Sequence, residues 1–479
     1  MIVFRIVSIK RKDKMEKRSR DLAKNTGILA IGTFLPKLAS FITLPILTAC
    51  LTKAEYGTYD LISTLVSLIL PIATIKLEAG MFRFLIDSRN NREECKRIIT
   101  TALFFMLPIA FFTVLIMFFV LQLNPITKLL ICIYFFIDSI FRFLQQIVRG
   151  LGRNTVFSIS AIAYSVLNMC FIVLFVKWQG YGLNGVLLSM NISLIVASII
   201  LFISVHLFSF LSFSCFSKST LLKMIKYSWP MLPNSLSSWV MRLSDRLVIT
   251  AVLGIEANAV YAVANKIPQL MSIAQSTFTF AWQENASLSV KDQDVEKYYS
   301  QMFRSVFDLM TGVFTGLIAV MPILFMVLVK GDYVEAYQQM PILLGGMFFC
   351  ALSAFLGGIY VAHMKTTSVG ISTFIAAVIN FIVDIALIHS IGLYAASGST
   401  LISYFILCIY RMIDVQKFQK VNYEWKHIIK CIIVIILMSI VSLQNSVLLQ
   451  VINFIVGISY AVYLNKKILI GLVKTVLRK

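Results

Sequence analysis

Three charged residues interrupt an apolar stretch that is long enough to cross a bilayer. The stretch WPMLPNSLSSWVMRLSDRLVITAVLG, residues 229–254, contains Arg242, Asp245 and Arg246. An ionisable side chain at a bilayer centre costs roughly 2.5–3.5 kcal/mol on insertion scales, so such groups usually face a protein interior or a water-filled path. The segment therefore indicates transport rather than a purely structural span.

Other charged residues lie inside further apolar stretches. Lys37 follows Pro36 in GTFLPKLASF, and the proline is expected to kink the helix beside the lysine. The predicted substrate-binding cations are Lys37, Arg142, Arg242, Arg246 and Lys266. The acids predicted to bind a coupling ion or to pair with neighbours are Asp138, Asp245, Asp308 and Asp384. Among the deeper groups cations exceed acids, so the interior is predicted to suit an anion such as phosphate.

Local pairing is the alternative for part of this set. Asp138 and Arg142 are spaced i, i+4, and Asp245 lies one turn after Arg242, so each acid can pair along its own helix. Lys37 has no such partner within its span and favours a cavity role, as does Lys266, although a neighbouring helix can supply a partner.

The composition is that of a polytopic membrane protein. Of the 479 residues, 59% are hydrophobic and 14% are charged, and the mean hydropathy is +0.86. A helix needs about 20 apolar residues to cross the hydrocarbon core, and about fourteen such runs occur. The predicted spans are 26–50, 60–86, 98–122, 127–149, 154–177, 183–210, 227–252, 257–282, 304–329, 338–363, 366–389, 391–411, 427–443 and 446–465. Continuous apolar runs predict an all-α bundle and exclude a barrel.

The net charge of +21 follows the membrane rather than a nucleic acid. Lysine and arginine are concentrated in the N-terminal segment, every second loop and the C-terminal tail, which places both termini in the cytoplasm by the positive-inside rule. Met15 opens a second possible start, so residues 1–14 are a candidate start-site artefact.

The order of spans divides the chain into two lobes and an appendage. The N-lobe holds spans one to six and the C-lobe spans seven to twelve. The predicted limits are 1–25 for a basic cytoplasmic segment, 26–210 for the N-lobe, 211–226 for a linker, 227–411 for the C-lobe, 412–426 for a cytoplasmic loop, 427–465 for two further spans and 466–479 for a basic tail.

An internal repeat supports this division. ILTACLTKAEYGTYDL (46–61) aligns with VITAVLGIEANAVYAV (248–263), which places Thr48 on Thr250 and Tyr59 on Tyr261. A repeat of six spans inserts both halves in the same orientation, so their pseudo-twofold axis is predicted to run along the membrane normal.

Several chemistries have no support in the sequence. The cysteines are scattered singly and the four histidines are dispersed, so neither a metal site nor a cofactor is predicted. The longest predicted soluble loop, 284–304, is too short for an ATPase domain, and no GxxxxGK[ST] motif occurs. Transport is therefore expected to be secondary or passive, and no catalytic residue is assigned.

Three stretches resemble bacterial polysaccharide and O-antigen flippases, the Wzx-like branch of the multidrug/oligosaccharidyl-lipid/polysaccharide exporter superfamily. They are KNTGILAIGTFLPKLASFITLPILT with the following EYGTYDL, SDRLVITAVLG with Tyr261-Ala262-Val263-Ala264, and GGIYVAHMKTTSVGISTFIAAVINFIVDIALIHSIGLYAASGSTLISYFILCIYR. The resemblance covers essentially residues 20–465. The sequence departs from it at Asp384, where many relatives have a second asparagine four residues after the first.

The resemblance implies a non-enzymatic flippase that moves an undecaprenyl-pyrophosphate-linked oligosaccharide to the outer leaflet by alternating access, for O-antigen, capsule or exopolysaccharide synthesis. The expected partners are this lipid-linked substrate, membrane lipids, a coupling proton or sodium ion, and polysaccharide polymerase machinery. Two alternatives stay open: an exporter of another substrate, such as a lipid II-like molecule or a drug, and a membrane-embedded polymerase. The cationic interior argues against a cationic drug, and the short outer loops argue against an enzyme.

Overall fold

The computed structural model describes residues 32, 34–290 and 292–477, and across these residues it is helical without strands. Ten of the helices are long and apolar enough to cross a membrane. The predicted all-α polytopic class is therefore confirmed. The predicted cytoplasmic segment 1–25 and the alternative start at Met15 lie outside the described residues.

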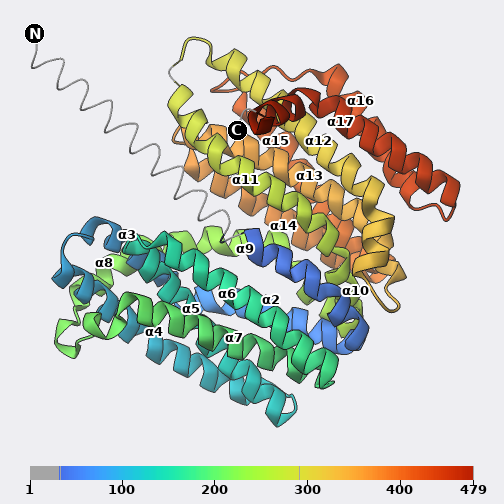
Figure 1. Ribbon diagram of the computed structural model, residues 1–479. Helices are drawn as coiled ribbons and strands as arrows, with labels where there is room; N and C mark the ends of the chain where they lie inside the picture. The colour runs from blue at the N-terminus through green and yellow to red at the C-terminus, as the bar shows by residue number, and fades with distance from the viewer. Residues whose placement is uncertain (1–31, 33, 291, 478–479) are drawn as a thin grey trace, which may run out of the picture. The chain divides into compact units, whose positions relative to one another are not determined.

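Within the described residues, each of the fourteen predicted spans falls on helical segments (Figure 1). The first described helix is Phe34–Cys50. The helices of the first half that follow are α2 (Lys53–Ala73), α3 (Leu77–Ser88), α4 (Arg92–Val120), α5 (Pro125–Gly150), α6 (Asn154–Ile172), the π-helix η1 (Val173–Trp178), α7 (Gly182–Val205), η2 (Leu207–Phe210), η3 (Phe213–Cys215) and α8 (Lys218–Ser228). Those of the second half are α9 (Met231–Val252), α10 (Ile255–Ala264), α11 (Lys266–Ser289), α12 (Val295–Leu328), α13 (Val334–Ala362), α14 (Thr366–Ile391), α15 (Leu393–Val415), α16 (Trp425–Ser442) and α17 (Val447–Leu477).

Two predicted spans are broken rather than continuous. Span 60–86 is divided between α2 and α3, because Ile75 and Lys76 adopt left-handed backbone conformations with φ of 50° and 55°. Thr74 lies in this break, and its hydroxyl donates to Leu70 O at 3.0 Å. Span 257–282 is divided between α10 and α11 at Asn265, whose side-chain amide donates to Tyr261 O at 2.9 Å.

The segment 284–304, predicted as a soluble loop, is mostly helical, so its predicted loop conformation is wrong. Helix α11 continues to Ser289 and α12 already begins at Val295. Tyr299 of α12 donates its hydroxyl to Ala286 O of α11 at 2.7 Å, and both side chains are buried. Packing between the two helix ends therefore extends them past the limits of the apolar runs.

The chain folds as two compact units. Unit 1 comprises the chain up to Cys50 and Leu65–Leu232, and unit 2 comprises Leu51–Thr64 and Pro233–Lys479. The segment Leu51–Thr64 thus belongs to unit 2, although it falls within the predicted N-lobe, 26–210. The predicted limits of the lobes stay a prediction.

Close backbone packing attaches the first half of α2 to unit 2. Asn258 of α10 donates its side-chain amide to Gly57 O at 3.0 Å. A Cβ atom at Gly57 would lie 2.1 Å from Ile255 O, so only glycine permits this approach. Lys53 pairs with Asp332 at 3.0 Å in the loop before α13. These interactions hold the start of α2, including Asp60, against the other helices of unit 2.

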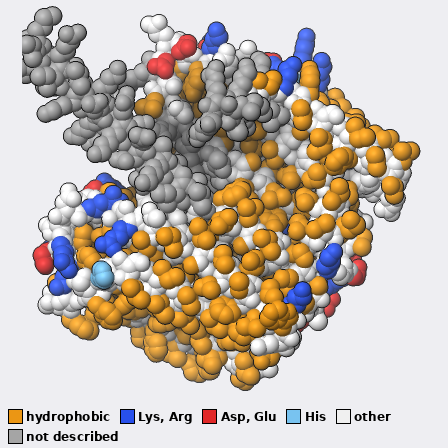
Figure 2. Space-filling view, viewed as in Figure 1, with side chains coloured by type: hydrophobic (Ala, Val, Ile, Leu, Met, Phe, Trp, Pro, Cys, Tyr) orange, Lys and Arg blue, Asp and Glu red, His pale blue; other side chains and the backbone are white. Residues whose placement is uncertain are grey.

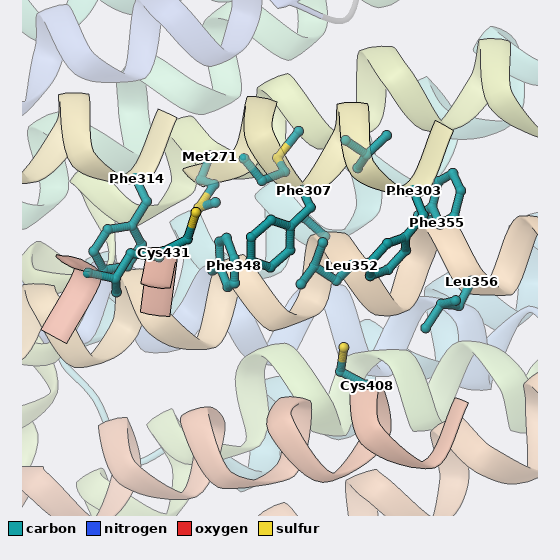
Figure 3. Packing of buried hydrophobic residues seen from close by; sticks show 14 of the residues in the cluster. Met271, Phe303, Phe307, Phe314, Phe348, Leu352, Phe355, Leu356, Cys408 and Cys431 are labelled. Carbon is teal, nitrogen blue, oxygen red and sulfur yellow. The ribbon is translucent and has the colours of Figure 1, made fainter. Parts of the chain in front are cut away.

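The aromatic core of unit 2 holds α11, α12 and α13 together (Figure 3). The indole of Trp282 stacks on Phe355 with 4.4 Å between ring centroids and donates to Phe355 O at 2.9 Å. Phe307 of α12 meets Phe348 of α13 edge-on, with 5.6 Å between centroids. This layer contacts α15 through α13, and the added helices α16 and α17 through α12.

Large apolar side chains remain exposed along several helices, including α4, α14, α16 and α17. Figure 2 shows hydrophobic side chains over most of the visible described surface, with lysines and arginines gathered near its margins. Contiguous apolar surface of this extent is typical of a lipid-facing exterior. The chain is accordingly a multi-pass membrane protein.

Candidate functional site

Asp245 of α9 is the centre of a buried polar network in unit 2. One carboxylate oxygen accepts from the hydroxyl of Tyr261 on α10 at 2.6 Å and from that of Thr400 on α15 at 2.8 Å. The amide of Asn380 on α14, oriented by its hydrogen bonds, donates to the other oxygen at 3.2 Å and accepts from Ser399 at 3.2 Å. Asp245 itself is 2% exposed. Four helices therefore position this carboxylate.

Asp384 lies one helical turn after Asn380 on α14 and is fully buried. Neither of its carboxylate oxygens has a hydrogen-bond partner among the described residues. Asp384 is close enough to Asp245 for the two negative charges to repel each other. A buried carboxylate is normally paired, coordinated to a cation or protonated, so its two free oxygens call for a ligand.

Arg246, next to Asp245 in sequence, turns to a different acid. Its Nε lies 2.6 Å from Asp60 Oδ2, and both side chains are largely buried. Lys266, at the start of α11, adds a second positive charge near Asp60. Three carboxylates thus face two cationic side chains in this region, a deficit of one positive charge.

This geometry suits one small cation. Asp245 and Asp384 offer carboxylate oxygens, and the Thr400 hydroxyl oxygen lies beside Asp245. Oxygen donors of this kind bind hard cations, and acids inside membrane spans commonly carry protons or coupling ions. The residues therefore fit a proton or a single monovalent cation. Such binding would stabilise Asp384 most, because its carboxylate oxygens have no hydrogen-bond partner among the described residues.

The cations predicted from the sequence are distributed over both units. In unit 2, Arg242 has an exposed side chain, and its Nε donates to Ser238 O at 3.0 Å rather than pairing with Asp245. Arg246 is engaged by Asp60, and Lys266 is partly buried. The pairing of Arg242 with Asp245 that the spacing allowed does not form.

Unit 1 holds the other two predicted cations. Arg142 Nε lies 2.7 Å from Asp138 Oδ2 on α5, so the i, i+4 pair forms as the spacing allowed. The Arg142 side chain is nevertheless 47% exposed, and Glu78 of α3 adds a further attractive interaction. Lys37 is exposed, and within the described chain no acid pairs with it.

Asp308 pairs with neighbouring side chains, which is one of the two roles that the sequence analysis gave it. Its Oδ1 lies 2.5 Å from His427 Nε2 on α16, and its Oδ2 lies 3.7 Å from Arg304 Nε. The structure therefore keeps Asp308 apart from the Asp245 network and supplies it with partners of its own.

Sequence reasoning missed Asp60 as a site residue. Asp60 belongs to the EYGTYDL segment, and nothing in the sequence indicated that this segment packs through Gly57 against α10. Tyr261 and Thr400 are neutral residues in apolar helices, so their residue types gave no sign of a site. Tyr261 stood out only through the internal repeat, and Thr400 only through the GLYAASGST stretch of the family resemblance.

Residues 22–284, more than half of the chain, match the sequence profile of a protein family that is described as "Polysaccharide biosynthesis protein". The chain belongs to this family. No curated protein matches the chain in sequence.

Solved structures show that the fold of this family member is that of multidrug/oligosaccharidyl-lipid/polysaccharide transporters. The lipid II flippase MurJ in an inward closed conformation is 16% identical, with a TM-score of 0.67, and the match covers 93% of this chain and 99% of that one. An inward-facing multidrug resistance MATE transporter is 13% identical with a TM-score of 0.67, covering 81% and 98%. A superfamily transporter from Pyrococcus furiosus is 12% identical with a TM-score of 0.58, covering 82% and 95%. The resemblance seen in the sequence is confirmed at the level of family and fold.

Proposed function

We propose that this protein is a flippase that moves a lipid-linked oligosaccharide, carried on undecaprenyl pyrophosphate, from the cytoplasmic to the outer leaflet of a bacterial plasma membrane for surface polysaccharide synthesis. The proposal rests on membership of the polysaccharide biosynthesis family and on the fold shared with a lipid II flippase. Transport proceeds by alternating access, with both termini in the cytoplasm.

One observation supports an anionic substrate above all others. Lys37, Arg142 and Arg242 each present an exposed side chain on a helix that is predicted to span the membrane. Charged side chains at this depth avoid lipid and face water or a bound ligand. Arginine in particular offers paired N–H donors that match phosphate oxygens. Lys37 and Arg142 in unit 1, and separately Arg242 in unit 2, are therefore each proposed to contact the anionic headgroup during transport.

Energy for transport is proposed to come from a cation gradient. A proton or sodium ion neutralises the carboxylates Asp245 and Asp384, whose combined charge the neighbouring cations do not balance. Binding there exerts its effect on α9, α14 and α15, the helices that carry the network. A change in their packing is the means by which the ion alters access to the substrate.

Deleting the gene tests the proposed function. We expect lipid-linked oligosaccharide to accumulate on the inner leaflet and surface polysaccharide to be lost in a strain without a redundant flippase. Complementation by Lys37→Gln, Arg142→Gln or Arg242→Gln should fall well below wild type at matched expression. Arg83→Gln is the control, because Arg83 is an exposed residue of α3 whose ion pair among the described residues is with Asp87. Unchanged surface polysaccharide in the deletion strain would refute the proposal.

A further inference from the structure

A second cluster of chemically reactive side chains lies away from the Asp245 network. Asp308 of α12 and His427 and Cys431 of α16 place one donor atom each within 4.8 Å of one another. His427 and Cys431 are spaced i, i+4, so both project from one face of α16. This spacing is the one by which a single helix supplies two ligands to a metal ion.

The distances suit a tetrahedral ion after a small adjustment. Cys431 Sγ lies 3.6 Å from His427 Nε2. His427 Nε2 lies 2.5 Å from Asp308 Oδ1. Ligands at about 2.0–2.3 Å from zinc lie about 3.3–3.8 Å from one another in a tetrahedron. The sulfur and nitrogen already have this separation. The contact between Asp308 and His427 has to open by about 1 Å, and the Asp308 oxygen lies within 4.8 Å of the Cys431 sulfur.

Neighbouring groups hold the cluster and leave it accessible. Asn465 of α17 donates to Asp308 O at 3.1 Å, which fixes this turn of α12. The hydroxyl of Tyr460, also on α17, lies 3.3 Å from Cys431 Sγ. A cavity of about 1310 Å³ opens onto Asp308, His427 and Tyr460. An ion can therefore enter, and water can fill the fourth position.

Arg304 competes with a metal ion for Asp308. Its guanidinium lies 3.7 Å from Asp308 Oδ2 and also pairs with Glu424. Because Glu424 remains a partner, Arg304 can leave Asp308 without becoming an unpaired charge. The Asp308 oxygen that faces His427 is already turned away from Arg304.

We propose that Asp308, His427 and Cys431 bind a zinc ion or a similar divalent d-block metal. Mixed oxygen, nitrogen and sulfur donors suit zinc in particular. Cys431 binds as the thiolate and releases its proton to water on binding. The ion joins α16 to α12 and so secures the added helices to the core of unit 2.

Metal titration of the purified full-length protein in detergent tests this site. Zn²⁺ should raise Tm in a dose-dependent way, and Co²⁺ should produce a near-ultraviolet thiolate-to-metal charge-transfer band. Cys431→Ser should abolish the band, and His427→Gln should weaken metal binding by at least about tenfold. Cys408→Ser is the matched control, a buried cysteine in the same unit, and it should keep both signals.

Two results would overturn the proposal. One is an equal Tm shift in wild type and in the His427→Gln/Cys431→Ser double variant, which would assign the metal to other groups. The other is a wild-type protein that binds neither Zn²⁺ nor Co²⁺. That result would show that Asp308 and His427 form an ordinary hydrogen bond and no metal site. If the variants fail to fold, X-ray absorption of zinc-loaded wild type decides: the proposal requires one sulfur ligand and at least one imidazole.

Discussion

Charged residues inside the membrane-spanning helices have different surroundings in the two units. In unit 1, Arg142 pairs with Asp138 on its own helix and remains 47% exposed. In unit 2, Arg246 pairs with Asp60 from another helix and is 6% exposed. The unit 1 pair leaves its cation available to a ligand, whereas the unit 2 cluster is closed to large molecules. This difference fits two separate roles. The exposed cations contact the anionic substrate, and the buried network of unit 2 binds a small cation.

The internal repeat sharpens this contrast. Aligning Thr48 with Thr250 places Thr43 and Leu44 opposite Asp245 and Arg246. The hydroxyl of Thr43 donates only to Ser40 O of its own helix, at 3.2 Å. The two halves of the repeat therefore match where one helix ends and the next begins. The charges of Asp245 and Arg246 occur only in the second half of the repeat.

Breaking the buried pair in unit 2 should have the largest effect. Asp60→Ala leaves Arg246 buried without its acid, and loss of one partner of such a pair costs about 3–5 kcal/mol. We expect a marked fall in Tm and in the yield of folded protein. Asp332→Ala removes the acid of the exposed Lys53 pair and should cost less than about 1 kcal/mol. Equal effects of the two substitutions on Tm would contradict the distinction between buried and exposed pairs.

Removing one donor from Asp245 should have an intermediate effect. Tyr261→Phe deletes the 2.6 Å hydrogen bond while keeping the ring in place. A hydrogen bond to a charged group contributes about 1.5–3 kcal/mol, so stability should fall by an amount in this range. Denaturant unfolding in detergent measures the change. A free energy of unfolding equal to that of wild type would show that Asp245 does not depend on this donor.

Neutralising Arg142 in unit 1 should change stability less than breaking the Asp60 pair. Arg142→Gln removes the positive charge beside Asp138, whose side chain is 8% exposed, but keeps an N–H donor for that carboxylate. We expect a fall in Tm smaller than that of Asp60→Ala, together with a clear loss of complementation, because the proposed role of Arg142 is contact with pyrophosphate. Arg142→Lys keeps the charge and should retain part of the activity. Full activity of Arg142→Gln would remove Arg142 from the proposed substrate path.

The fold class and the spans were predictable because continuous apolar runs determine membrane helices directly. The break between α2 and α3 was not predictable in this way, because none of its residues, Thr74, Ile75 and Lys76, is a glycine or a proline. The pairing of Arg246 with Asp60 was equally hidden, since it joins residues far apart in the chain through backbone packing at Gly57. Charges can be located from sequence, whereas their partners depend on which helices meet.

The most direct test of ion coupling compares wild type with Asp384→Asn in proteoliposomes that contain the lipid-linked oligosaccharide. Flipping is measured as the sugar accessible to an external glycosidase, with an imposed sodium gradient, an imposed proton gradient, or neither. We predict that one gradient accelerates flipping by wild type, and that the folded Asp384→Asn protein loses this acceleration. Acceleration of the same size in both proteins, or none in wild type, would contradict a coupling role for the buried carboxylates.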